Sequence, residues 1–275
     1  MFSKTEAAQF CAAAAANKPY AKTGSSVKTA ATGNFGFVSV CSVSAVLAAW
    51  ELLCRMRCIP EYMLPSPAGV VRALVHDAPL LLQHSKTTLF EAAAGISISI
   101  IAAFAAAFLM DRWNLFKKAL YPFLVFTQTV PSIAVAPLLI LWLGYGVLAK
   151  IVLIVLTCSF PLAINLASGF ASADGDSIRL LKTMGATERA VFIHIKVPSS
   201  LPFFFSGLKL AVSYAVVGAV ISEWLGGTQG LGVYMIRVKK SYAFDKMFAV
   251  IFLISALSLF AVAGISLLEK RIIKK

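Results

Sequence analysis

The chain has 275 residues, of which 59% are hydrophobic and 13% are charged, and its formal net charge is +13. Soluble domains hold about 45–50% apolar and about 25% charged residues, so this balance excludes an ordinary soluble protein. We therefore expect a membrane protein whose basic charge sets its orientation and contacts anionic lipid, rather than one that binds nucleic acid.

The first 34 residues are rich in Ala, Lys and Ser and carry a single acidic residue, Glu6. This composition predicts a disordered cytoplasmic tail. The scarcity of acidic residues is also found in transit peptides, although arginine is absent here, and five consecutive alanines are too short for the apolar region of a signal peptide. Residues 35–275 are expected to form one membrane domain, because no Pro-, Ser- or Gly-rich linker divides them.

Six apolar runs are long enough to cross a membrane, which takes about 20 residues because the hydrocarbon core is about 30 Å thick. They cover residues 35–54, 90–110, 119–143, 151–170, 201–225 and 247–268. The fifth carries Lys209 and Glu223 near its ends, where a side chain can reach the headgroups. The runs are longer than β-barrel strands and do not alternate polar with apolar residues. The expected fold is an all-α membrane protein with six transmembrane helices.

Lysines and arginines predict the orientation of these spans. With six spans, both termini share one side with residues 111–118 and 171–200, and that side carries sixteen of the 25 Lys and Arg residues. Cytoplasmic loops carry the excess of such residues. We therefore expect both termini in the cytoplasm.

The residue types needed for catalysis or metal binding do not occur in the required patterns. None of the three histidines stands in a His-Glu-x-x-His arrangement, and the sequence has no glycine-rich phosphate loop with its lysine. The five cysteines are expected to act as small hydrophobic side chains. Cys54 and Cys58 lie one helical turn apart, but no second Cys or His pair completes a zinc site. We predict no catalytic residue, metal or cofactor on this chain; the cysteines are Cys11, Cys41, Cys54, Cys58 and Cys158.

A charged segment lies between the fourth and fifth runs. Asp176 is expected to cap a helix over 177–184 whose apolar residues, including Leu181 and Met184, share one face. Gly185 can end that helix in the left-handed conformation at no steric cost. A connector needs only about two to eight residues, so a structured segment of this length predicts a surface that docks another protein.

A second helix follows this corner. Ala186 is small, and Thr187 is expected to cap a helix over 188–196 with an acidic residue at its positive end. Pro198 and Pro202 are expected to stop this helix before the membrane. The sequence thus predicts two short helices joined by a tight turn in the cytoplasm.

Polar side chains inside spans are costly unless they face a cavity or a partner. For each one a hydrogen bond between helices is the alternative interpretation. Pro131, Pro137 and Pro161 interrupt backbone hydrogen bonding in the third and fourth runs, which is tolerated beside protein or a water-filled cavity. Gln128 and Glu223 are the first candidates for a substrate path. Thr127, Ser159 and Asn165 complete the predicted path residues. The other polar residues within the runs are Thr157, Ser213 and Ser222.

Three separated motifs resemble one known family. Gly185 and Pro198, followed by "SSLPFFFSGLKLAVSYAVVGAVISEWLGG", resemble the cytoplasmic loop of permease subunits of bacterial ATP-binding-cassette (ABC) importers. "QTVPSIAVAPLLILWLGYGVLAKIVLIVLTCSFPLAINLASGF", residues 128–170, and "LPSPAGVVRALV", before the second run, match the same family. The group within it that imports sulfonates, taurine, nitrate and thiamine-precursor pyrimidines is the most similar. The resemblance covers the chain from about residue 36 to its end.

The resemblance implies the fold of a type I importer permease in a bacterial inner membrane. It implies two copies of this chain, two cytoplasmic ATPases that hold ATP and Mg²⁺, and an extracytoplasmic solute-binding protein. Closure of the ATPases would move the loops, so that the path faces in and out by turns. The residues that it places at the ATPase are Arg179, Leu181, Met184, Gly185, Ala186, Thr187, Arg189 and Pro198.

One departure from the family concerns charge. The family usually has Glu-Ala-Ala six residues before the glycine, where this chain has Arg179, Leu180 and Leu181. A reversed charge on the ATPase could compensate for this change.

Two other functions remain as alternatives. A secondary transporter or channel could also have six spans, but no pair of similar halves and no carboxylate deep in a span is expected here. A membrane-embedded enzyme would need a convergent set of acid, base or metal ligands. The outer face would be basic, which could steer an anionic solute or pair with an acidic binding protein. Its charges are Arg72, Lys86, Arg237, Lys239 and Lys240.

Overall fold

The computed structural model describes residues 34–56, 60 and 63–273. The chain divides into two compact units, residues 1–48 and 49–275, and helix α2 (Asn34–Arg55) runs across their boundary. All further helices belong to the second unit. The predicted N-terminal tail, with Cys11, and also Cys58 lie outside the described residues.

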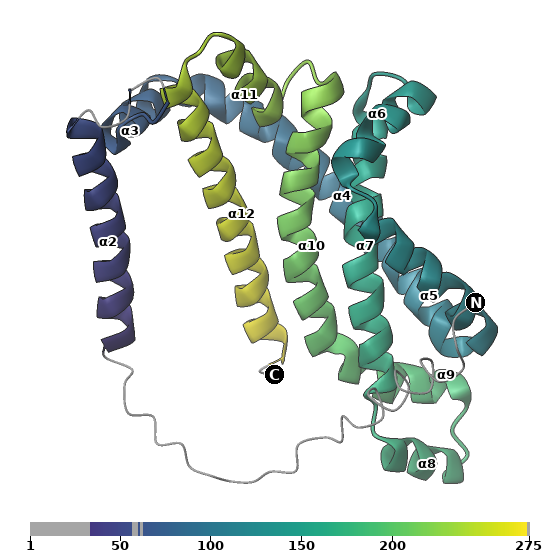
Figure 1. Cartoon of the computed structure of the whole chain (residues 1–275). Coiled ribbons are helices and arrows are strands. Elements are labelled where there is room, and N and C mark those ends of the chain that lie inside the picture. Colours follow the sequence, from purple (N-terminus) through teal and green to yellow (C-terminus); the bar gives the residue numbers. More distant parts are fainter. Residues whose placement is uncertain (1–33, 57–59, 61–62, 274–275) are drawn as a thin grey trace, which may run out of the picture. The chain divides into compact units, whose positions relative to one another are not determined.

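Within the described ranges every regular element is a helix, which confirms the all-α prediction (Figure 1). After α2 the helices are α3 (Pro67–His76), α4 (Ala78–Arg112), α5 (Asn114–Thr129), α6 (Ser132–Leu143), α7 (Val147–Ala171), α8 (Gly175–Thr183), α9 (Glu188–Val191), the π-helical segment η1 (Phe192–Lys196), α10 (Val197–Gly226), α11 (Leu231–Lys240) and α12 (Phe244–Ile273).

Among the described residues, four helices are long and apolar enough to cross a membrane. They are α4, α7, α12 and the continuous helix Glu188–Gly226, while α5 and α6 together form a fifth candidate that is bent by 102°. The predicted run 35–54 coincides with α2, which is not among these candidates. The structure thus supports four or five spans, and the count of six stays a prediction.

The bend between α5 and α6 lies where the sequence predicted an interruption. Val130 and Pro131 are extended, with ψ of 123° and 122°, so helical hydrogen bonding stops between Thr129 and Ser132. Pro137 and Pro161 each remove a backbone donor but lie inside α6 and α7. Of these three prolines only Pro131 lies at a helix break, because a proline favours an extended backbone at the residue before it.

The core forms where α7 packs against α4 and α10; α7 and α10 lie side by side in Figure 1, and α4 crosses behind them. Ala211, Ala215 and Ala219 recur every four residues on α10 and are completely buried. Small residues at this spacing let two helix backbones approach closely. Cys158 of α7 is completely buried as well, and its Sγ donates to the Ala211 carbonyl at 3.2 Å.

The helix that begins at Glu188 does not stop at Pro198 or Pro202, so that prediction is wrong. It continues through η1 into α10, a single helix of 39 residues. In η1 the Val197 N–H donates to the Phe192 carbonyl, five residues back. Such a wide turn already leaves carbonyl groups unpaired, so the missing N–H of Pro198 directly after it costs little.

The two charged residues of the predicted fifth run are paired inside the bundle rather than extended from its ends. Lys209 forms an ion pair with Glu269 of α12. Glu223 is only 1% exposed and accepts hydrogen bonds from α4 and α11. Both have partners from other helices, which the run by itself could not reveal.

Candidate functional site

The segment between α7 and α10 begins with a helix cap. Asp174, rather than the predicted Asp176, caps α8. Its Oδ2 accepts from the Ser177 hydroxyl at 2.6 Å and the Ser177 N–H at 3.0 Å. These hydrogen bonds hold the pKa of the Asp174 carboxyl below its usual value. Asp174 caps the helix because it lies just before the first turn, where its carboxylate can accept from the free backbone N–H groups.

The predicted turn between the two short helices is present. Gly185 has a φ of +85°, in the left-handed region. Its N–H donates to the Lys182 carbonyl at 3.0 Å and the Ala186 N–H donates to the Leu181 carbonyl at 3.1 Å, which closes the end of α8. Thr187 Oγ1 accepts from the Ala190 N–H at 3.3 Å and caps α9, as predicted.

Helix α8 projects from the bundle and has no buried residue, so its side chains are available to a partner (Figure 1). Leu180 and Met184, one turn apart, are 62% and 76% exposed, and Leu181 beside them is half-buried. Arg179 is exposed and lies 3.7 Å from Asp176. An apolar pair on a projecting helix, rimmed by charge, is typical of a protein interaction site.

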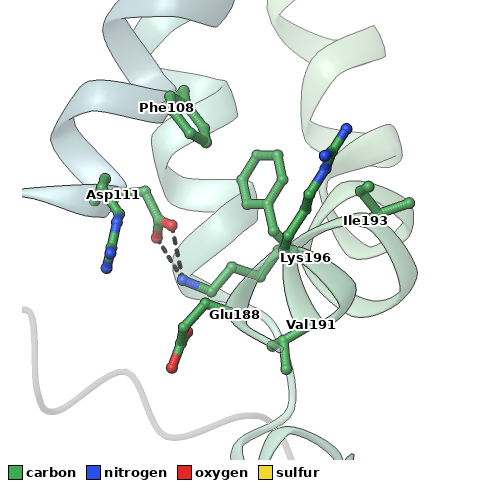
Figure 2. A pocket seen from close by; sticks show the side chains of 9 residues that line it. Phe108, Asp111, Glu188, Val191, Ile193 and Lys196 are labelled. Carbon is green, nitrogen blue, oxygen red and sulfur yellow. Dashed lines mark hydrogen bonds and ion pairs between the residues drawn. The ribbon is translucent and has the colours of Figure 1, made fainter. Parts of the chain in front are cut away.

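A pocket of about 610 Å³ lies behind the corner, where the end of α4 meets α9 and η1 (Figure 2). In Figure 2 the side chains of Lys196 and Asp111 point toward each other, and their ion pair is 2.7 Å long. Arg189 lines this pocket, whereas Pro198 lies exposed at the start of α10. The lining residues are Phe108, Asp111, Arg112, Glu188, Arg189, Val191, Phe192, Ile193 and Lys196.

A second pocket, of about 210 Å³, lies at the break between α5 and α6. Thr127 and Gln128 line it together with Thr157, Tyr214 and Ser132. Gln128 Nε2 donates to the Thr157 carbonyl at 3.2 Å, so the amide crosses from α5 to α7. The interrupted helix therefore brings two of the predicted path residues to one cavity.

The other predicted path residues lie elsewhere. Ser159 and Asn165 are half-buried and donate to carbonyls of their own helix, those of Val155 at 2.6 Å and Pro161 at 2.7 Å. The Glu223 side chain faces α4 and α11. Whether any of the five touches a solute stays a prediction.

A buried polar cluster under α11 was not predicted from the sequence. His84, Thr88 and Glu91 of α4 are all at most 5% exposed, and Lys150 of α7 donates to Glu91 at 2.6 Å. The second run was predicted to begin at residue 90, next to Glu91, whereas α4 begins at Ala78, so Glu91 lies well inside this helix. A usable signal existed, since spacings of four and three residues place His84, Thr88 and Glu91 on one helix face.

Residues 95–274 match the model of the family described as binding-protein-dependent transport system inner membrane component. The chain belongs to this family. It is therefore a permease of an ABC importer and not an enzyme, and the gradient-driven alternative is excluded. Permeases of this family work in the membrane with an ATPase and a binding protein, and nucleotide binding belongs to the ATPase.

Several relatives match over most of their length. The formylaminopyrimidine transport permease protein ThiX of Halalkalibacterium halodurans is 38% identical over 225 residues, which covers 82% of this chain and 90% of the relative. A probable ABC transporter permease of Haemophilus influenzae is 35% identical, over 79% and 89% of the two chains. A putative aliphatic sulfonates transport permease protein, SsuC, of Bacillus subtilis is 26% identical, over 84% of each.

Solved ABC transporters share the fold of this permease. A crystal structure of an amino acid ABC transporter with histidines aligns with a TM-score of 0.61 at 16% identity, over 72% of this chain and 96% of the other. The inward-facing MetNI methionine ABC transporter aligns with a TM-score of 0.55 at 17% identity, over 72% and 94%.

Proposed function

We propose that two copies of this permease pair to form a translocation path, and that each copy binds one cytoplasmic ATPase carrying ATP and Mg²⁺. An extracytoplasmic binding protein delivers the solute to the pair. The main support is the α8–α9 corner, since a projecting helix with two exposed apolar residues is suited to insertion into a partner. Closure of the ATPases then shifts the corner and reorients the path.

In this proposal the corner transmits motion because it is stiff. Caps at Asp174 and Thr187, the closed turn at Gly185 and the 2.5 Å ion pair between Lys182 and Glu188 fix α8 against α9. Since α9 continues into α10, movement of α8 reaches the membrane without a flexible joint. The residues that carry the contact are Arg179, Leu181, Met184, Gly185, Ala186, Thr187, Arg189 and Pro198.

Arg179 should meet an acidic residue on the ATPase, because it stands where the family usually has glutamate. The test is binding between the purified permease and its ATPase. Arg179→Glu should weaken binding, and an opposite charge change on the facing ATPase residue should restore it. Arg237→Glu, a charge change on α11, which follows the far end of α10, is the matched control. Unchanged binding in Arg179→Glu would remove this contact from the proposal.

The solute path is proposed to run past Thr127 and Gln128 at the break between α5 and α6. Ser159, Asn165 and Glu223 complete the candidate set, with Glu223 acting near the outer end. Both termini, including the tail 1–34, lie in the cytoplasm, and residues 35–275 form the permease domain of the inner membrane. The pocket that Thr127 and Gln128 share supports this route.

The solute is proposed to be a thiamine-precursor pyrimidine. The relative named for formylaminopyrimidine transport is 38% identical, against 26% and 24% for relatives named for sulfonate and taurine transport. The experiment is uptake into vesicles that hold the permease, its ATPase and its binding protein, with labelled formylaminopyrimidine, taurine and nitrate compared. If only taurine or only nitrate were taken up, the solute would belong to the sulfonate or nitrate class and not to the pyrimidine class. A permease that purifies without an ATPase would contradict the whole assembly.

A further inference from the structure

Helix α11 is fixed to the bundle through its first turn. A helix start leaves its first N–H groups without partners in its own helix. Here three successive amides donate to side chains of α4 and α10 instead. The pairs are Gly230 N–H to His84 Nδ1 at 3.0 Å, Leu231 N–H to Thr88 Oγ1 at 2.9 Å, and Gly232 N–H to Glu223 Oε2 at 2.6 Å. The far end of α11 is therefore presented on a firmly attached helix.

The rest of α11 has a buried face and an exposed end. Leu231, Tyr234 and Val238 are at most 6% exposed and belong to one apolar cluster with residues of α4 and α12. The last turn carries three exposed cations, and none of them forms an ion pair with a described residue. They are Arg237, Lys239 and Lys240. Three cations against Asp245, at the start of α12, leave this end of α11 positively charged.

Tyr242 follows this last turn and has an unusual backbone conformation. Its φ is +57°, and among the described residues it is the one non-glycine residue with a positive φ. The Tyr242 N–H donates to the Lys239 carbonyl at 3.2 Å, and the Ala243 N–H donates to the Val238 carbonyl at 3.0 Å. This pair of hydrogen bonds closes many helix ends, with glycine as the usual residue at the left-handed position. A tyrosine at that position is strained, because its Cβ crowds the backbone.

The same turn closes α8 and provides a comparison within the molecule. There the left-handed residue is Gly185, and the N–H groups of Gly185 and Ala186 make the two corresponding hydrogen bonds. Backbone geometry alone would therefore favour glycine at position 242 as well. Strained residues concentrate at functional sites, so the tyrosine has to be explained by what its side chain does.

The Tyr242 side chain contributes little to the packing of the fold. It is 78% exposed, and its ring lies beside that of Phe244, with 6.2 Å between the ring centres and 69° between the ring planes. Tyrosine and arginine are enriched among the residues that contribute most to protein binding. An exposed tyrosine next to cations without ion-pair partners therefore has the composition of a docking surface.

We propose that the end of α11 docks an acidic face of the extracytoplasmic solute-binding protein, with Tyr242 as the anchor and the three cations around it. The inference rests on the proposed function, which supplies the binding protein and places this end of the bundle outside. α11 lies at the opposite end of the bundle from α8 and α9 (Figure 1), so it faces the side from which the solute arrives. The positive charge of the last turn favours an acidic partner surface and speeds its encounter.

The test is the Kd between the purified permease–ATPase complex in lipid nanodiscs and its solute-loaded binding protein. Tyr242→Gly should raise the Kd about tenfold or more, as expected for loss of an anchor residue. The thermal unfolding temperature of the same variant should stay level or rise, because glycine adopts a positive φ without strain. Tyr242→Phe keeps the ring and should bind nearly as tightly as wild type. A fall in both affinity and unfolding temperature for Tyr242→Gly would show a structural residue and overturn the proposal.

The cations are tested separately from the ring. Lys239→Glu combined with Lys240→Glu should raise the Kd and weaken its dependence on salt, because the attraction between opposite charges is lost. Lys117→Glu combined with Lys118→Glu, the same change at two adjacent exposed lysines of α5, is the matched control and should bind as wild type does. Equal Kd values for the two double variants would contradict the proposal.

Two further outcomes separate this inference from the proposed function. If Tyr242→Gly binds as tightly as wild type, the docking surface is wrong, the ring is left as a contact to lipid headgroups, and delivery by a binding protein stands. If the wild-type complex binds no binding protein at all, delivery itself is wrong and the docking surface falls with it.

Discussion

The Lys196 ammonium donates to both carboxylate oxygens of Asp111, at 2.8 Å and 2.7 Å, and the two residues are 85 positions apart in the sequence. Lys196 belongs to η1 and Asp111 to the last turn of α4, so the pair joins the helix that follows the α8–α9 corner to a membrane helix. Both side chains are less than a quarter exposed. Hydrogen bonds to charged groups contribute about 1.5–3 kcal/mol, which is enough to fix the relative position of two helices.

Breaking this pair should reduce coupling. In Asp111→Asn or Lys196→Met, stimulation of ATP hydrolysis by the loaded binding protein should fall about fivefold or more, corresponding to a loss of about 1 kcal/mol. The reciprocal exchange, Asp111→Lys with Lys196→Asp, should recover part of the stimulation. Lys118→Met, an exposed change on α5, is the control. Full stimulation in both single variants would mean that the pair has no part in coupling.

Gly185→Val should strain the corner, because a β-branched residue at positive φ costs about 1–2 kcal/mol or more. The variant should insert and pair normally, yet lose most uptake and most stimulated ATP hydrolysis. Gly175→Ala is the matched control in the same segment, since the added methyl group has open space and an ordinary backbone. If vesicles with Gly185→Val transport as well as those with Gly175→Ala, the segment is only a connector.

Gln128→Ala should lower uptake about fivefold, the loss expected for one hydrogen bond of about 1 kcal/mol to the solute. Basal ATP hydrolysis should not change, since none of the residues that line the pocket belongs to the α8–α9 corner. Thr129→Val controls for changes in the same turn, because Thr129 donates to its own helix and does not line the pocket. Equal uptake in the two variants would exclude Gln128 from the path.

Asp77 should make stability depend on pH. Burial would raise the pKa of its carboxyl, but hydrogen bonds from Lys246, Tyr234 and His76 outweigh that effect and hold the pKa well below its usual range. The stabilisation is therefore present above about pH 4, the unfolded value, and is lost as pH falls further. The unfolding temperature of Asp77→Asn in detergent should lie below that of wild type near neutral pH, and the difference should shrink in acid. A constant difference down to the lowest accessible pH would contradict this assignment.

The orientation can be tested with two cysteines. In a background without native cysteines, Thr187→Cys should react with an impermeant thiol reagent only after cell lysis, because the proposed topology places the corner in the cytoplasm. Thr228→Cys, in the exposed turn between α10 and α11 at the opposite end, should react in intact cells. The reverse pattern would invert the topology.

Features that depend on local sequence could be predicted. The left-handed Gly185, the Thr187 cap and the break at Pro131 each follow from the conformations that a few neighbouring residues allow. The choice of Asp174 over Asp176 was missed because both are acidic residues near a helix start. The hydrogen bonds of the Ser177 side chain decide between them.

Features that depend on tertiary contacts could not be predicted. The continuation of the helix through Pro198 requires the π turn of η1, which no short pattern marks. The burial of Glu91 could not be predicted because its partner, Lys150, comes from another helix, 59 residues later. The apolar run around Lys209 predicts that its side chain reaches the headgroups. The run cannot show that its partner is Glu269, which lies 60 residues later.

The unbroken helix from Glu188 to Gly226 has a mechanical consequence. Thirty-nine residues at about 1.5 Å each make a rod roughly 58 Å long. The α8–α9 corner lies at one end, and Glu223, which accepts from the Gly232 N–H of α11, lies near the other. A rod that tilts by about 10° about one end displaces its far end by about 10 Å, twice the helix pitch. In the proposed assembly, work done by ATP at the cytoplasmic surface would thus reach the opposite surface as leverage, without any change of fold along the way.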